Sequence, residues 1–417
     1  MKKTMTKLAG LTALLGIAFL FVLTSCEKDK PEDLLGSISI QLKLKEGLGD
    51  LSLANISLSL INTQDNVEKK MLTSQTGLAT FTALPAGSYN LNVSEPREDG
   101  EYTLTGTATN IVVRMKEETT VELILDATIS NAGLVIKELY FVGAGDGYVS
   151  LFKDQFVEIF NNSSEVIYAD GLYVGHFFSV ESLSLPPSET PGLDIENSVY
   201  MDWVYKIPGD GTQHPIEPSK SVMIALNAIN FKEGNPMADK AVDNTVADFE
   251  FYGVDWLEEQ GLTGHVWDFD NPDVPNVTPV YLGTAGLALM DLTSPVVMIF
   301  RKENDFNQSD VYNFQYTNNY GSETEIDLVK FPVEDIIDGV EVLGNSSLGK
   351  FKKLSKKVDA AFTYINPDGG AYYNSQSLRR KIDDAATAKF GRTILQDLNN
   401  SFLDFEVLDL PTPKSYN

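Results

Sequence analysis

The sequence predicts a mainly β protein, with a small antiparallel β-sandwich followed by a larger β-rich domain that carries insertions. Residues 37–45 alternate strictly between apolar and polar side chains, which is the period of a half-buried strand. Turn-forming clusters such as Pro85-Ala86-Gly87 separate similar stretches. Helical periodicity is scarce, and its best short candidates are 255–260 and 378–390. Short strands without helices between them favour packed antiparallel sheets.

Composition excludes several function classes. The 417 residues include 32 Lys and Arg against 59 Asp and Glu, which gives a formal net charge of −27 at pH 7. Such a chain is unsuited to nucleic acid, because phosphates are bound by neutralising Lys and Arg. A single Cys excludes a disulfide framework, a thiolate zinc cluster and a CxxC redox centre. The three His, at positions 176, 214 and 265, are too few for a histidine-rich metal site.

Residues 1–25 have the pattern of a secretory signal peptide. Lys2, Lys3 and Lys7 precede an uncharged apolar run from Leu8 to Leu23. This run is shorter than the roughly 20 residues that a membrane-spanning helix needs, and a charged start before a short apolar core is typical of an exported protein.

The boundary Leu23-Thr24-Ser25-Cys26 resembles a bacterial lipobox. The resemblance implies that Cys26 becomes the first residue of the mature chain and carries acyl chains such as palmitate, which would hold the protein to a membrane. The alternative is an ordinary signal peptide with an incidental Cys. Residues 26–36 form a charged tether that resembles the export signal of Bacteroidetes surface lipoproteins, or they are a solvated linker. The expected location is the outer membrane, facing the cell exterior.

Residues 37–127 are the predicted sandwich. Alternating apolar positions recur near residues 56–60, 89–93 and 121–125. The run from Gly77 to Val93 resembles the transthyretin-like, carboxypeptidase-regulatory-type modules of surface proteins, which implies a stalk or spacer without catalytic residues.

Residues 133–410 form the predicted larger domain. Strand-like stretches occur at 134–142, 154–163, 218–225, 287–291 and 296–300. The stretch from Asp154 through Asp170-Gly171-Leu172 resembles the opening of a lamin-tail-type domain, and the C-terminal part resembles closing elements of Bacteroidetes lipoproteins of unknown function. Against compact lamin-tail modules the chain is long, with insertions near 176–215 and 232–282 that either form the functional surface or extend the fold.

Several motifs could carry chemistry, each with a plainer alternative. Gly344 to Phe351 nearly matches a phosphate-binding P-loop, but Phe351 stands where the magnesium-binding Ser or Thr belongs, so a loop is favoured. Five Lys between Lys350 and Lys357 could bind an anionic partner, although a charged edge strand is favoured. His265, near Trp267 and Asp268, is more typical of a structural His than of a catalytic pair.

Two loops rich in Asp and Asn are candidates for structural calcium, because they concentrate hard oxygen ligands. They are residues 268–273 and 304–310, and neither fits the EF-hand pattern; such loops commonly hydrogen-bond their own backbone instead. A group of aromatic residues could stack on sugar rings or fill the core. Its members are Phe249, Phe251, Tyr252, Trp256 and Trp267.

No set of nucleophile, base and orienting residue can be assembled, so we expect a non-enzyme with no cofactor and no catalytic residue. The expected function is a lipid-anchored binding or accessory protein of the outer membrane that assists a TonB-dependent transporter. The alternatives are a glycan-binding adhesin and a carbohydrate-active enzyme whose carboxylates the sequence does not single out.

Overall fold

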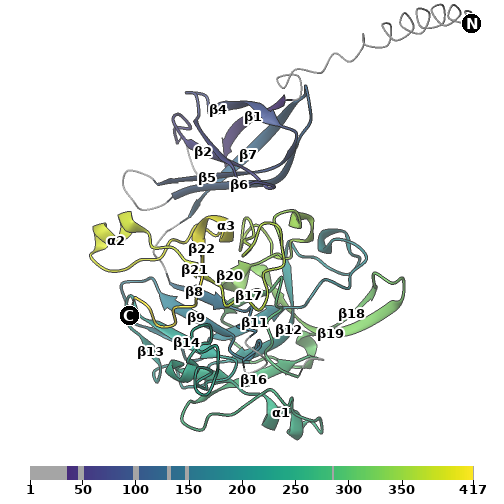
Figure 1. Ribbon diagram of the computed structural model, residues 1–417, viewed down its shortest axis with the longest axis vertical. Helices are drawn as coiled ribbons and strands as arrows, with labels where there is room; N and C mark the ends of the chain where they lie inside the picture. The colour runs from purple at the N-terminus through teal and green to yellow at the C-terminus, as the bar shows by residue number, and fades with distance from the viewer. Residues whose placement is uncertain are drawn as a thin grey trace, which may run out of the picture.

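The computed structural model describes residues 35–45, 51–96, 103–128, 133–145, 150–283 and 286–416. Over these residues the chain is mainly β, as predicted, with a smaller β-sandwich beside a larger β body (Figure 1). Cys26 and the predicted signal peptide lie outside the described residues. Among the helices that the structure describes, none is both long enough and apolar enough to cross a membrane.

The sandwich contains seven strands in the order β3-β2-β5-β6-β7-β1-β4. Strand β7 joins its two layers, because residues 118–125 pair with β1 and residues 126–128 pair with β6. The β1–β7 pair is parallel, which departs from the predicted antiparallel sandwich; the first and last strands need no hairpin between them and are free to run the same way. The strands are β1 (Leu35–Leu44), β2 (Ser57–Asn62), β3 (Glu68–Leu72), β4 (Leu78–Pro85), β5 (Gly87–Pro96), β6 (Thr103–Val113) and β7 (Glu118–Thr128).

The apolar residues of the alternating sequence pattern fill the sandwich core. Ile38, Ile40 and Leu42 of β1 are at most 1% exposed and pack in one cluster with apolar residues of the other layer. The polar residues between them lie on the opposite face, which explains why a strict period of two predicted this strand correctly.

The larger body is built on a 13-stranded sheet. Its strands are β8 (Leu134–Tyr140), β9 (Phe156–Asn161), β11 (Tyr173–Phe177), β12 (Ser198–Lys206), β14 (Ser221–Ala225), β15 (Phe249–Phe251), β16 (Asn276–Leu282), β17 (Val296–Phe300), β18 (Val311–Thr317), β19 (Glu323–Pro332), β20 (Ile336–Glu341), β21 (Ser377–Arg380) and β22 (Phe405–Leu408). A two-stranded ribbon joins β10 (Ile167–Tyr168) to β13 (Pro215–Ile216).

Helices are few and short. The α-helices are α1 (Val254–Glu259), α2 (Asp384–Phe390) and α3 (Ser401–Asp404), and the 3-10 helices are η2 (Pro187–Glu189), η3 (Asn244–Val246), η4 (Gln308–Asp310), η5 (Val333–Asp335) and η6 (Gly349–Phe351). Helix α1 lies at the end of the larger body farthest from the sandwich, whereas α2 and α3 lie near the sandwich (Figure 1).

The large sheet curves until β20 approaches β8. These two strands are not neighbours in the hydrogen-bonded order, but the backbone N–H of Ile136 in β8 donates to Asp338 Oδ2 in β20 at 2.6 Å. Strands of this sheet contribute buried apolar residues to one interior cluster. Its members from β8, β12, β17 and β20 include Ile136, Trp203, Val297 and Val340. A second cluster on the other side of β17 takes Val296, Met298 and Phe300, so this strand is apolar at every position.

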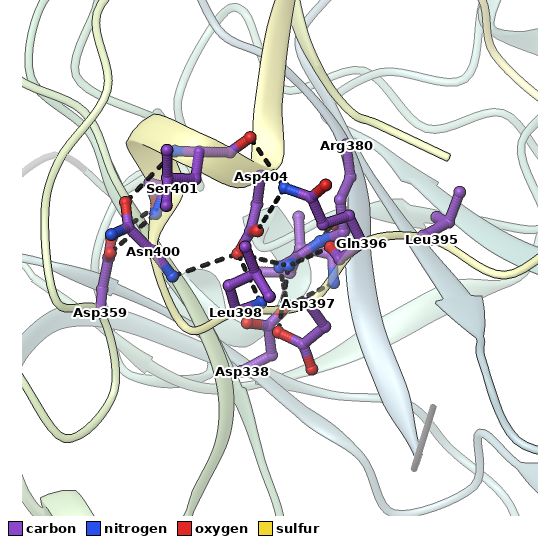
Figure 2. A network of polar contacts seen from close by, with 12 residues as sticks. Asp338, Asp359, Arg380, Leu395, Gln396, Asp397, Leu398, Asn400, Ser401 and Asp404 are labelled. Carbon is purple, nitrogen blue, oxygen red and sulfur yellow. Dashed lines mark hydrogen bonds and ion pairs between the residues drawn. The ribbon is translucent and has the colours of Figure 1, made fainter. Parts of the chain in front are cut away.

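We call the contact between β8 and β20 the seam, and a buried polar network links the two strands there (Figure 2). Arg380 of β21 is 1% exposed and reaches Asp338 Oδ2 at 2.6 Å, Asp397 Oδ1 at 3.2 Å and Asp404 Oδ2 at 3.4 Å. Its Nε also donates to the Ile136 carbonyl at 2.8 Å. Burial alone would lower the pKa of Arg380, but the three carboxylates outweigh it and raise the pKa. This guanidinium therefore ties the C-terminal segment to both sides of the seam.

One predicted strand is wrong, and one predicted helix is only partly right. The apolar stretch 287–291 forms no strand, because the side chain of Gln155 satisfies its backbone: Met290 N donates to Gln155 Oε1 and Gln155 Nε2 donates to Met290 O, both at 3.0 Å. The helix expected over 378–390 is strand β21 followed by α2, which begins at the N-cap Asp383. The expected insertions supply β12, β15 and β16, so they mainly extend the sheet.

Candidate functional site

A groove lies on the larger body where its loops meet the sandwich. Two adjoining cavities of about 310 and 350 Å³ share Glu181, Ser294, Leu343 and Leu348 in their linings, and we call them together the junction groove. The first also has Asn345, Asp368 and Ala371 in its wall. The second adds Val180, Leu183, Asp291 and Phe351.

Asp291 organises one wall of the groove. Its Oδ1 accepts hydrogen bonds from the backbone N–H groups of Thr293 at 2.8 Å and Ser294 at 3.1 Å, and its Oδ2 accepts from Ser179 Oγ at 3.0 Å. Burial alone would raise the pKa of Asp291, but these backbone donors and the charge of Lys353 outweigh it and lower the pKa. This carboxylate is therefore ionised and holds the turn at residues 291–294.

His176 of β11 contacts the backbone of the same turn. Its Nε2 accepts from the backbone N–H of Asp291 at 3.4 Å, so the ring proton is assigned to Nδ1, which donates to Asp202 Oδ1 at 2.9 Å. The imidazole is 2% exposed and stacks on Trp203 with ring centroids 5.5 Å apart. His176 thus positions the groove wall and does not face the groove.

The lysine-rich stretch 350–357 is not the expected edge strand. Lys353 is 1% exposed, and its Nζ donates to the carbonyl of Ser294 beneath the groove. Burial lowers the pKa of Lys353, an effect that the charges of Glu341 and Asp291 oppose. Lys352 pairs with Glu341 Oε2 at 2.8 Å. The sequence does not show which lysine of such a run is buried, because other residues close by in the chain are also lysines.

The stretch that resembles a P-loop forms the wall between the groove and the sandwich. It ends in η6, a 3-10 helix of three residues, and the Ser347 N–H donates to the side chain of Asn345 at 2.9 Å rather than facing a phosphate. Ser346 Oγ donates to the carbonyl of Thr63 in the sandwich. The interpretation as a loop is confirmed, because no α-helix follows the glycines.

Further contacts fix the sandwich beside the groove. Tyr364 OH donates to Asn66 Oδ1 at 3.0 Å, and Asn400 Nδ2 donates to Thr107 Oγ1. A Cβ atom on Gly349 would collide with the side chain of Asn110. Leu343 packs with Phe362 and Tyr364 in a small apolar cluster at this contact. The groove wall and the contact between the two units are therefore one continuous structure.

The two loops that are candidates for calcium do not bring their acidic side chains together around one point. In the part of the chain that the structure describes, no group of three His, Cys, Asp or Glu residues could hold a metal ion. Asp305 forms an ion pair with Lys206 and accepts a hydrogen bond from Tyr173 OH at 2.9 Å. Asp268 Oδ2 accepts from the Gly253 backbone at 2.8 Å, and burial raises the pKa of Asp268 to about 7.

The aromatic candidates divide between core and surface. Phe249 and Phe251 are buried, as the core interpretation predicts. Trp267 is 41% exposed and packs edge-on against Phe152, with ring centroids 5.0 Å apart. His265 lies beside it with ring centroids 5.2 Å apart.

Comparisons with known proteins agree with this architecture. Residues 217–412 match the family model "Protein of unknown function (DUF4876)", and residues 39–126 match a prealbumin-like fold domain. A crystal structure of a DUF4876 family protein from Bacteroides thetaiotaomicron is similar at 22% identity and a TM-score of 0.55, covering 89% of this chain and 94% of that one. No curated protein matches the chain in sequence.

Other solved structures are far less similar. The Bacillus anthracis TIE protein has 14% identity and a TM-score of 0.18, covering 46% of this chain and 28% of its own. A streptococcal ancillary pilin has 12% identity and a TM-score of 0.17, covering 46% and 53%. Neither supports an inference about function. The chain thus shares its fold, over 89% of its length, with a DUF4876 family protein; its residues 217–412 match the sequence model of that family of unknown function, and its residues 39–126 form the prealbumin-like module.

Proposed function

We propose that this chain is a non-catalytic binding protein of the bacterial outer membrane, anchored through Cys26, which holds a ligand in the junction groove. The observation that carries the proposal is the groove itself, whose two cavities of about 310 and 350 Å³ have walls fixed by Asp291, Lys353 and the contact with the sandwich. A preformed cavity with mixed apolar and polar walls is typical of a ligand site.

The same geometry favours binding over glycoside hydrolysis, which needs two carboxylates free to react. Asp291 is not free in this sense, because its Oδ1 accepts from the Thr293 hydroxyl at 2.9 Å, a hydroxyl that also lies 3.0 Å from Glu181. Both oxygens of Asp291 also accept hydrogen bonds from Ser179, Thr293 and Ser294. A carboxylate engaged in this way is a poor nucleophile, because its lone pairs are directed at fixed donors.

Blocking the groove tests its role. Ala371 lines the first cavity and is half-buried, so Ala371→Trp is expected to fill it and to lower the affinity for any groove ligand at least about tenfold, a loss of about 1.4 kcal/mol. Arrays of glycans and peptides should be probed with the wild-type protein, with Ala371→Trp, and with Ala388→Trp on exposed α2 as the matched control. Identical binding by all three proteins would exclude the first cavity of the groove as the ligand site.

The anchor is tested separately. Cys26→Ala is expected to abolish retention in the outer membrane, because the thiol is the predicted attachment point for the acyl chains. Membrane fractionation and the mass of the mature protein measure this. A variant that remains membrane-bound with unchanged mass would overturn the lipoprotein part of the proposal.

The proposed partner is a TonB-dependent transporter in the same membrane. An anchored protein is confined to the plane of the membrane, which raises its effective concentration near such a transporter. Crosslinking in intact cells is expected to recover a β-barrel transporter. Protease added to intact cells should remove the protein if it faces outward.

Glycan binding is a second candidate, favoured by one observation. Trp267 and Val266 are 41% and 78% exposed, and an exposed indole suits a sugar ring. Trp267→Ala would then abolish binding on the glycan array, whereas Ala371→Trp would not.

A further inference from the structure

The junction groove is lined by negative charge. Its walls include the carboxylates of Glu181, Asp291 and Asp368, and among the described residues that line it there is no Lys, Arg or His. The nearby Lys353 is fully covered and already donates to the Ser294 carbonyl. The groove is therefore suited to a positive or neutral ligand, and an anion would be repelled.

Glu181 is a carboxylate that is free to receive a ligand. Its side chain is exposed and shares the Thr293 hydroxyl, at 3.0 Å, with Asp291 at 2.9 Å. A hydroxyl has one proton and can donate to only one acceptor at a time. Asp291 has further donors in the backbone of Thr293 and Ser294, whereas no other side-chain hydrogen bond of Glu181 occurs among the described residues.

Part of the wall next to Glu181 is apolar. Val180, Leu183, Leu343, Leu348 and Phe351 line the second cavity. A carboxylate that lines a cavity together with apolar side chains matches a ligand side chain with a hydrocarbon stem and a charged head, as in Lys and Arg. The two adjoining cavities extend beyond the volume of one such side chain, and Asp368 supplies a second carboxylate in the first cavity.

We propose that the junction groove binds a basic segment of a polypeptide, with a Lys or Arg side chain lying along the apolar wall and its charged head on Glu181. This inference rests on the proposed binding function and specifies the ligand. Asp368 faces a further donor or cation of the same segment, and the net charge of −27 attracts a basic partner from a distance.

The test uses a fluorescein-labelled peptide of alternating Leu and Lys, and the same peptide with every Lys acetylated. Fluorescence anisotropy is expected to show binding of the first peptide, weakened at higher salt, and at least about tenfold weaker binding of the acetylated one. Glu181→Gln is expected to weaken binding of the first peptide about tenfold. Glu325→Gln, an exposed substitution on β19, is the matched control and should bind like the wild-type protein.

The outcomes separate this inference from the function on which it rests. Equal binding of both peptides, with Ala371→Trp still abolishing it, would leave the groove as a ligand site and overturn the cationic ligand. Equal affinities of Glu181→Gln and Glu325→Gln would also overturn it. Spermidine alone binding as tightly as the peptide would overturn the polypeptide as the source of the cation. Ala371 lines only the first cavity, so binding that neither Ala371→Trp nor Glu181→Gln changes would reject the groove itself.

Discussion

Replacing Arg380 with leucine is expected to lower the free energy of unfolding by about 3–5 kcal/mol, the cost of breaking a buried ion pair by removing one partner. Arg380 is the cation at the centre of three carboxylates, those of Asp338, Asp397 and Asp404. Without it, these carboxylates lose their counter-charge in a site where Asp338 and Asp404 are at most 3% exposed in their side chains. The link from β21 to the Ile136 carbonyl is lost as well.

Arg379→Leu is the matched control, because the neighbouring residue pairs with Glu406 at 2.7 Å but both side chains are partly exposed. Exposed pairs contribute about 0–1 kcal/mol, so this variant should unfold near the wild-type midpoint. Urea denaturation followed by circular dichroism measures both variants. Similar losses in the two proteins would show that the seam does not depend on the buried guanidinium.

How far the fold could be predicted depends on where each strand lies. Strands with one face on a core, such as β1 with Ile38 and Ile40, carry a period of two that the sequence displays directly. Apolar runs carry no such information. The run 296–300 is a strand buried on both faces, whereas 287–291 is a loop, because Gln155 from a distant part of the chain pairs with the backbone of Met290.

The groove could not be predicted for a related reason. Glu181, Asp291 and Asp368 come from three separate segments that line the groove only in the folded chain. Nothing in the sequence distinguishes them from the other acidic residues, of which there are 59 in all. Part of the site did have a local signal. Asp291 is followed two residues later by Thr293, a spacing that predicts a side-chain-stabilised turn, and the structure has this turn. The burial of Lys353 has no counterpart in sequence.

The second large effect is a loss of stability as the pH rises from about 5 to 8. One guanidinium cannot compensate three carboxylates, and burial raises the pKa of Asp404 to about 7 and that of Asp397 to about 6, against the lowering effect of Arg380. Between the ordinary pKa of an Asp and these values, the folded protein binds more protons than the unfolded chain. The free energy of unfolding therefore falls with rising pH across this window, by on the order of 4 kcal/mol for Asp404.

Asp404→Asn isolates this contribution. Its Oδ2 accepts from the backbone N–H groups of Leu398 at 3.0 Å and Asn400 at 3.1 Å, and an amide oxygen can do the same. The new amide nitrogen would face Gln396, whose Nε2 now donates to Oδ1 at 3.1 Å and whose own amide can turn to accept instead. Urea midpoints at pH 5, 6, 7 and 8 should fall steeply in the wild-type protein and less steeply in Asp404→Asn. Parallel slopes would mean that Asp404 is ionised throughout this range, because a carboxylate that does not titrate contributes no pH dependence.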